Sequence, residues 1–123
     1  MKIRSHKELI VFKSSYELAL QIHNLTKSFP TEERFSLTDQ VRRSSRSVAT
    51  NIAEAFRKRR YPKSFISKLS DSEGEAAETQ VWLSFAVSFG YLEEEIIQEL
   101  DEKYDLLEKQ IITMIQSPEK WST

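Results

Sequence analysis

Cysteine is absent from this chain of 123 residues, and glycine, proline and histidine are scarce, with two, three and two residues respectively. Without cysteine the chain can form no disulfide, no thiolate nucleophile, no zinc knuckle and no iron–sulfur cluster, which is consistent with a reducing cytoplasm. Two distant glycines cannot build the loops with which Walker and Rossmann motifs hold phosphates. Thiol redox chemistry and these nucleotide-binding loops are therefore excluded, and we expect no cofactor.

Histidine occurs only at His6 and His23, and neither belongs to a recognisable catalytic or metal-binding motif. The di-iron sites of helix bundles need Glu-x-x-His pairs that project inward. Ile3 and Leu20 stand three residues before the two histidines, so no such pair exists. His23 lies on the apolar stripe of an expected helix and is interpreted as a packing residue rather than a base. The sequence thus predicts no catalytic residue, no metal site and no small-molecule substrate.

Long hydrophobic runs are also missing. Residues 1–7 are polar, and the apolar run that follows them, 9–12, is too short for a signal peptide or a membrane-spanning helix. Charged residues make up 30% of the chain and hydrophobic residues 39%, which is typical of a folded domain with a hydrophobic core. We therefore expect a cytoplasmic protein with no membrane partner.

Apolar residues recur at helical spacing in four stretches of the chain. The alternation is clearest in the last stretch, at Ile97, Leu100, Tyr104, Leu107, Ile111 and Met114. The predicted helices cover about 8–28, 36–60, 62–89 and 92–116. Helices of this length with short connections pack most simply as an all-α, antiparallel up-down-up-down four-helix bundle. The whole chain, 1–123, is expected to form this single domain.

Several residues mark the expected helix boundaries. Ser36 is followed three residues later by Asp39, an imperfect capping box that predicts a helix start. Pro62 suits the first turn of the third helix, where its missing N–H costs nothing. Gly90 is expected to end that helix in a left-handed conformation. Gly74 lies inside the same helix, which indicates either close packing or a weak point.

The net charge of −1 hides a strong segregation of charge. Between residues 42 and 68 nine basic residues accompany one acid, Glu54, whereas between 71 and 108 twelve acids accompany one base, Lys103. One interpretation is a phosphate-binding surface for RNA or DNA. The alternative is that these cations complement the dipole of their helix and form surface ion pairs. The candidate nucleic-acid-binding residues are Arg42, Arg46, Arg57, Lys58, Arg59, Arg60 and Lys63.

The end of the third predicted helix is apolar nearly all round, which exceeds what one core-facing stripe requires. Trp82, Phe85 and Phe89 are therefore candidate residues of an interface between copies of the chain. The alternative is that loops and the C-terminal segment with Trp121 cover them. A basic helix that meets an acidic face on the next copy would make a heterologous contact, and such contacts close into rings.

The run from Gln40 to Glu54 resembles the second-helix motif of the four-helix bundle proteins related to those encoded in 23S rRNA intervening sequences. Phe29-Pro30 before it and Ser64-Phe65 after it are similar to flanking positions of that family. Residues 78–83 resemble the third-helix motif, and Gly90-Tyr91-Leu92 the turn that follows. The resemblance extends over most of the chain.

The resemblance implies a bacterial protein whose bundle has a left-handed twist and assembles as a homopentamer. Related proteins are the accessory variability determinant subunits of diversity-generating retroelements, whose pentamers bind nucleic acid and a reverse transcriptase. Two hypotheses follow from the family and the residues. The first is a non-enzymatic homo-oligomeric scaffold whose partner is itself, and the second is a module that binds RNA or DNA.

Four polar residues of the second helix match the family's motif: Arg43, Ser47, Asn51 and Glu54. They follow one another at spacings of four, four and three and so fall on nearly one helical stripe. The resemblance implies that they form a packed polar network or an interface. It also implies a partly buried Glu54 carboxylate that pairs with Arg43 of its own or a neighbouring subunit.

Overall fold

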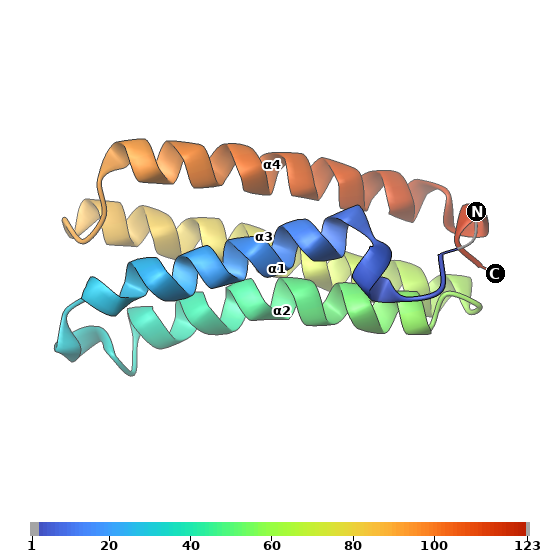
Figure 1. Cartoon of the computed structure of the whole chain (residues 1–123), viewed down its shortest axis with the longest axis horizontal. Coiled ribbons are helices and arrows are strands. Elements are labelled where there is room, and N and C mark those ends of the chain that lie inside the picture. Colours follow the sequence, from blue (N-terminus) through green and yellow to red (C-terminus); the bar gives the residue numbers. More distant parts are fainter. Residues whose placement is uncertain (1–2, 123) are drawn as a thin grey trace.

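The computed structural model describes residues 3–122, and all its regular secondary structure is helical (Figure 1). The part described contains no strand, which confirms the predicted all-α class. Short 3-10 turns at His6–Glu8, Thr26–Ser28, Thr31–Glu33 and Pro118–Lys120 flank the long helices. The four long helices are α1 (Ile10–Leu25), α2 (Leu37–Arg57), α3 (Pro62–Ser88) and α4 (Glu94–Gln116).

Successive helices run in opposite directions along one bundle axis (Figure 1). The α1–α2 connection and the α3–α4 turn lie at one end, which we call the turn end. The α2–α3 turn and both chain ends lie at the other, which we call the terminal end. Contact is most extensive between α2 and α3, and α1 contacts α4 less than successive helices contact each other. This arrangement is the predicted up-down-up-down bundle.

The core is built from one stripe of each helix, as the apolar spacing predicts. All six apolar positions of the predicted α4 stripe are buried. Tyr104 and Phe65 are the largest side chains that are completely buried. Removing an apolar side chain from water contributes about 25 cal/mol per Å², so this shared stripe is the main source of stability.

Small hydroxyl side chains line the contact between α2 and α3. The Oγ atoms of Ser44 and Thr79, both fully buried, lie 2.7 Å apart, and Thr79 also donates to the carbonyl of Glu75 at 2.9 Å. Ser72 donates across the same contact to the carbonyl of Val48 at 2.8 Å. Small side chains let the two helices approach closely, and their hydroxyl groups have hydrogen-bond partners despite burial.

The two expected signals at helix ends had different outcomes. Gly90 has a φ of 80°, and the N–H of Tyr91 donates to the Ala86 carbonyl at 2.8 Å, so the left-handed end of α3 is confirmed. The predicted helix start is confirmed, because Ser36 is the N-cap of α2, but the capping box itself is wrong. The Ser36 side chain makes no cap bond and instead donates its hydroxyl to Glu33 at 2.6 Å. Glu33 itself accepts the N–H of Leu37 at 3.4 Å and so takes over the capping role.

Gly74 is not required by packing, because a Cβ atom added there would meet no atom within 4 Å. Of the two interpretations of Gly74, close packing is therefore wrong, and the glycine is a weak point of the helix. We predict that Gly74→Ala raises the free energy of unfolding by about 0.5 to 1 kcal/mol, since alanine restricts the unfolded chain and favours the helix. Chemical denaturation measures this change. Gly90→Ala is the control and should destabilise the chain, and an unstabilised Gly74→Ala variant would contradict the prediction.

Candidate binding surfaces

Three aromatic side chains form a row near the turn end, two of them from α3 and the third from Phe89, the residue that follows it. The ring centroids of Trp82 and Phe85 lie 6.0 Å apart, and those of Phe85 and Phe89 lie 5.9 Å apart. Phe85 is 45% exposed and Phe89 is 55% exposed, while Trp82 is half-buried against the core. Spacings of three and four residues place the three rings on one side of the helix. We call Trp82, Phe85 and Phe89 the aromatic row.

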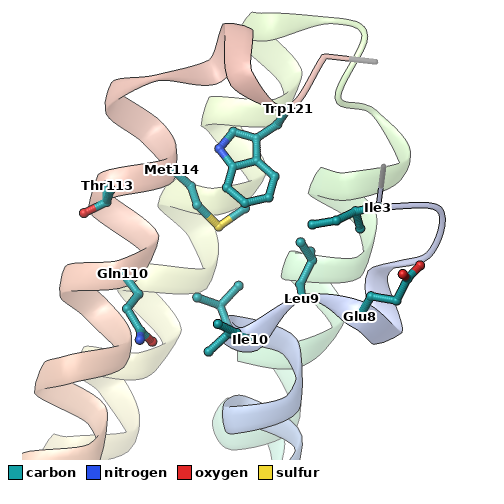
Figure 2. A pocket seen from close by; sticks show the side chains of 9 residues that line it. Ile3, Glu8, Leu9, Ile10, Gln110, Thr113, Met114 and Trp121 are labelled. Atoms are coloured by element: carbon teal, nitrogen blue, oxygen red, sulfur yellow. The ribbon is translucent and has the colours of Figure 1, made fainter. Parts of the chain in front are cut away.

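Trp121 does not cover the aromatic row. Figure 2 shows its indole beside Met114, facing Ile3 and Leu9 across an apolar hollow of about 380 Å³. This hollow lies at the terminal end of the bundle, far from the α3–α4 turn (Figure 1). The alternative in which the C-terminal segment shields the row is therefore wrong for the residues described. Phe85 and Phe89 stay open to solvent in a single copy of the chain.

A hydrogen bond that the sequence did not suggest links the two connections at the turn end. The hydroxyl of Tyr91, in the α3–α4 turn, donates to Glu33 in the α1–α2 connection at 2.9 Å. The hydrogen bonds from Ser36 and then Tyr91 lower the pKa of the Glu33 carboxyl. Tyr91 also packs against Phe89, with ring centroids 5.7 Å apart, so this link supports one end of the aromatic row.

Arg43 pairs with two carboxylates of α3. Its guanidinium lies 2.9 Å from Glu75 and also bonds Glu78. The hydrogen bond that Arg43 donates to Glu75 is the main reason that the pKa of Arg43 is raised. Glu78 accepts a further hydrogen bond from the Trp82 indole at 3.1 Å. Arg43 is therefore connected to the aromatic row through Glu78. In the sequence, the spacing of three between Glu75 and Glu78 was the signal that could have indicated a shared basic partner.

The four residues of the family motif do not form one network within the chain. Asn51 donates its side-chain amide to the carbonyl of Ser47 at 2.9 Å. Glu54 pairs with Lys68 of α3 at 3.1 Å, and its side chain is 52% exposed. The expected pair between Arg43 and a partly buried Glu54 of the same chain is therefore wrong, because each residue has its own partner on α3. A pair between neighbouring copies stays a prediction.

We predict that Glu54→Ala lowers the free energy of unfolding of the single chain by no more than about 0.5 kcal/mol, because exposed ion pairs contribute little. Urea denaturation of a dilute sample measures this change, and Lys68→Ala should match it. A loss several times larger that disappears on dilution would instead indicate that Glu54 is buried against a second copy.

The predicted basic residues form two clusters, one on the first half of α2 and one around its C-terminal end. Arg42 and Arg57 are fifteen residues apart, about 22 Å at 1.5 Å per residue. Arg42 donates to the Thr26 hydroxyl at 2.7 Å, and Arg46 lies 3.2 Å from Nδ1 of His23. Arginine can only donate, so Nδ1 must be the acceptor. Burial and the nearby arginines Arg42 and Arg46 lower the pKa of His23, in agreement with a neutral packing histidine.

The second basic cluster surrounds the α2–α3 turn at the terminal end. Arg59 stacks over the Phe56 ring at 4.0 Å and donates to the Phe56 carbonyl at 2.9 Å. Arg59, two residues beyond α2, therefore places its positive charge at the C-terminus of that helix, as the dipole interpretation expects. The other members are exposed, and no carboxylate pairs with them among residues 3–122: Arg57, Lys58, Arg60 and Lys63.

A group of carboxylates lies on α4 beside the core. Burial, followed by repulsion from Asp105, Glu73 and Asp101, raises the pKa of Glu108 to about 7. Tyr104 and Glu108 both carry a buried oxygen without a hydrogen-bond partner in the part of the chain that is described.

Across residues 3–122, no three acidic or histidine side chains are placed to hold a metal ion. The helices in this range also lack an apolar stretch that would cross a lipid bilayer.

Comparison with known proteins gives a family but no activity. A family model described as 23S rRNA-intervening sequence protein matches residues 7–113. The chain is also similar to the crystal structure of a protein with unknown function from the S23 ribosomal protein family of Bacteroides thetaiotaomicron. The two have 30% sequence identity and a TM-score of 0.78, and the match covers 87% of this chain and 96% of that one. No curated protein is significantly similar.

Proposed function

The chain belongs to the family of 23S rRNA-intervening sequence proteins, and on that premise we propose that it is a non-enzymatic scaffold that assembles as a homopentamer in the cytoplasm. The observation that carries the proposal is the exposed aromatic row on α3. Phe85 and Phe89 are each about half exposed in the single chain. Adjacent exposed aromatic rings are the usual anchors of protein association. Five copies is the number that the family resemblance implies.

Charge supports a contact between unlike surfaces of neighbouring copies. The exposed cations at the end of α2 and the acidic surfaces of α3 and α4 lie on one chain. A basic surface of one copy that meets an acidic surface of the next uses two different patches, and such a heterologous contact closes into a ring when the rotation fits. Opposite charges also steer the encounter and fix its orientation.

Sedimentation velocity, with light scattering as a second measure of mass, tests the proposed assembly. We expect one species with the mass of five chains, and we expect Phe85→Asp/Phe89→Asp to shift it to monomer because charges enter an apolar contact. Leu106→Asp is a matched control, since Leu106 is exposed on α4 and lies outside the row. A monomeric parent, or an unchanged mass in the double variant, would overturn the proposal.

A second candidate function is RNA or DNA binding by the basic cluster at the terminal end. Arg57, Lys58, Arg60 and Lys63 favour it because they are exposed and free of carboxylate partners among residues 3–122. Each lysine or arginine that neutralises a phosphate releases a counterion, so the affinity should fall steeply with salt. Electrophoretic retention of structured RNA and duplex DNA at about 50 mM salt tests this function. Arg57→Gln/Lys63→Gln should weaken retention, and a parent protein that retains neither ligand would exclude it.

A further inference from the structure

A basic hollow lies beside the first turns of α2, at the turn end of the bundle. It has a volume of about 360 Å³ and is lined by Arg34, Thr38, Asp39, Arg42, Arg43 and Arg46. A second hollow of about 420 Å³ shares three of these residues and reaches the end of α1. Hollows of a few hundred Å³ are large enough for a small ligand.

The charge of this hollow is not neutralised within the chain. Arg43 is occupied by Glu75 and Glu78. Arg34, Arg42 and Arg46 form no ion pair with a carboxylate anywhere in residues 3–122. One acid, Asp39, stands among the lining residues. The lining therefore carries a positive excess and offers guanidinium N–H groups to an acceptor.

Thr38 gives an independent indication of a ligand. It lines both hollows and is only 7% exposed, yet its hydroxyl has no hydrogen-bond partner among the described residues. A buried hydroxyl without a partner costs free energy, and buried polar groups are normally paired. Thr38 also belongs to the first turn of α2, whose helix dipole favours an anion, although Glu33 already accepts the N–H of Leu37 there.

We propose that this hollow binds a phosphate group that carries two negative charges. Phosphate oxygens are hydrogen-bond acceptors that would pair with the Thr38 hydroxyl and with the planar fork of Arg34. Arg42 would add its Nη1 group, because its Nε and Nη2 already donate to the Thr26 hydroxyl and the His23 carbonyl. A dianion suits a lining with a positive excess better than the single charge of a phosphodiester. This site lies about 22 Å along α2 from the terminal-end cluster and rests neither on the oligomer nor on nucleic-acid binding.

Isothermal titration calorimetry with inorganic pyrophosphate at low salt tests the site. Arg34→Gln should weaken binding about tenfold, because a charge-assisted hydrogen bond is lost. Thr38→Val, which keeps the shape of the side chain, should weaken it about fivefold. Lys109→Gln is the matched control, since it removes one exposed positive charge on α4 outside both hollows, and it should change binding less than about twofold. Circular dichroism melting confirms that each variant folds.

Two results would overturn the proposal: the absence of binding heat at millimolar pyrophosphate, or equal weakening by Arg34→Gln and Lys109→Gln, which would indicate diffuse attraction. A pair of dinucleotides, with and without a 5′-phosphate, identifies the source of the phosphate. If the 5′-phosphorylated dinucleotide competes with pyrophosphate and its partner does not, the site accepts the end of a nucleotide chain. If neither competes, the site is specific for small free phosphates.

Discussion

Glu108→Gln is expected to raise the free energy of unfolding by about 1 to 2 kcal/mol at pH 8 and to leave it nearly unchanged at pH 4. The side chain lies on α4 among Asp101, Asp105 and Glu73, and its burial raises the pKa to about 7. The glutamine removes a negative charge that destabilises the folded chain, because the carboxylate is partly buried and lies among other carboxylates. A full conversion of the shift, at about 1.4 kcal/mol per pKa unit, would give more, but the side chain is partly open to solvent, which screens the charge.

The direction follows from which state holds the proton more tightly. The carboxyl of the folded chain keeps its proton up to about pH 7, whereas the unfolded chain loses it near its ordinary pKa of 4.5. The contribution of Glu108 to stability is therefore highest below pH 4.5, falls between pH 4.5 and 7, and stays at the lower level above pH 7. Urea denaturation at a series of pH values measures this window.

Glu102→Gln is the control for Glu108→Gln. Glu102 is exposed on the same helix, and its substitution removes the same formal charge. Its effect on unfolding should be small at every pH. If the two variants had the same pH profile, the effect would come from the overall negative charge of α4 rather than from the buried carboxyl.

Thr79→Val is expected to lower the free energy of unfolding by about 1 to 3 kcal/mol, because it leaves a buried donor without its acceptor. Thr79 donates to the Glu75 carbonyl, so Ser44 is the donor in the 2.7 Å contact between the two hydroxyls. Once Thr79 is replaced, Ser44 retains only a 3.4 Å contact with the Val41 carbonyl. Ser44→Ala should cost less, because Thr79 keeps its own acceptor.

A double-mutant cycle separates this contact from other effects of the two substitutions. Ser44→Ala/Thr79→Val should cost less than the sum of the single variants, because no unpaired donor remains. Thr113→Val is the control, since Thr113 makes a similar bond to the Lys109 carbonyl on the exposed side of α4. Additive losses in the cycle would show that the contact between α2 and α3 does not depend on the hydroxyl pair.

Periodicity within one helix was enough to predict much of the fold. The α4 stripe is buried as expected because spacings of three and four determine which face a helix turns to its neighbours. Gly90 was predictable because a left-handed helix end selects strongly for glycine. The surplus of Trp82, Phe85 and Phe89 was also visible, since three large rings exceed what the core-facing stripe of α3 can bury.

Pairs between helices were harder to predict, because they depend on the rotation of one helix against another. Arg43 and Glu54 lie on one stripe of α2, but they do not pair with each other. Because of the way α3 is rotated against α2, Arg43 forms an ion pair with Glu75 and Glu54 forms one with Lys68. The hollow around Thr38 was hard to predict for a similar reason, since its lining combines residues of α2 with residues of the irregular connection before it. Helical spacing does not describe such a connection, so its geometry was not predictable.

The order of the helices has a consequence for how the chain folds. α1 packs against α2, α2 against α3 and α3 against α4, so most contacts join segments that are neighbours in the sequence (Figure 1). Closing short loops costs little entropy, and helical proteins with such local contacts fold in microseconds to milliseconds. The contact between α1 and α4 spans nearly the whole chain and is less extensive than the contacts between successive long helices. Hydrogen exchange should therefore be fastest where α1 and α4 meet and slowest between α2 and α3.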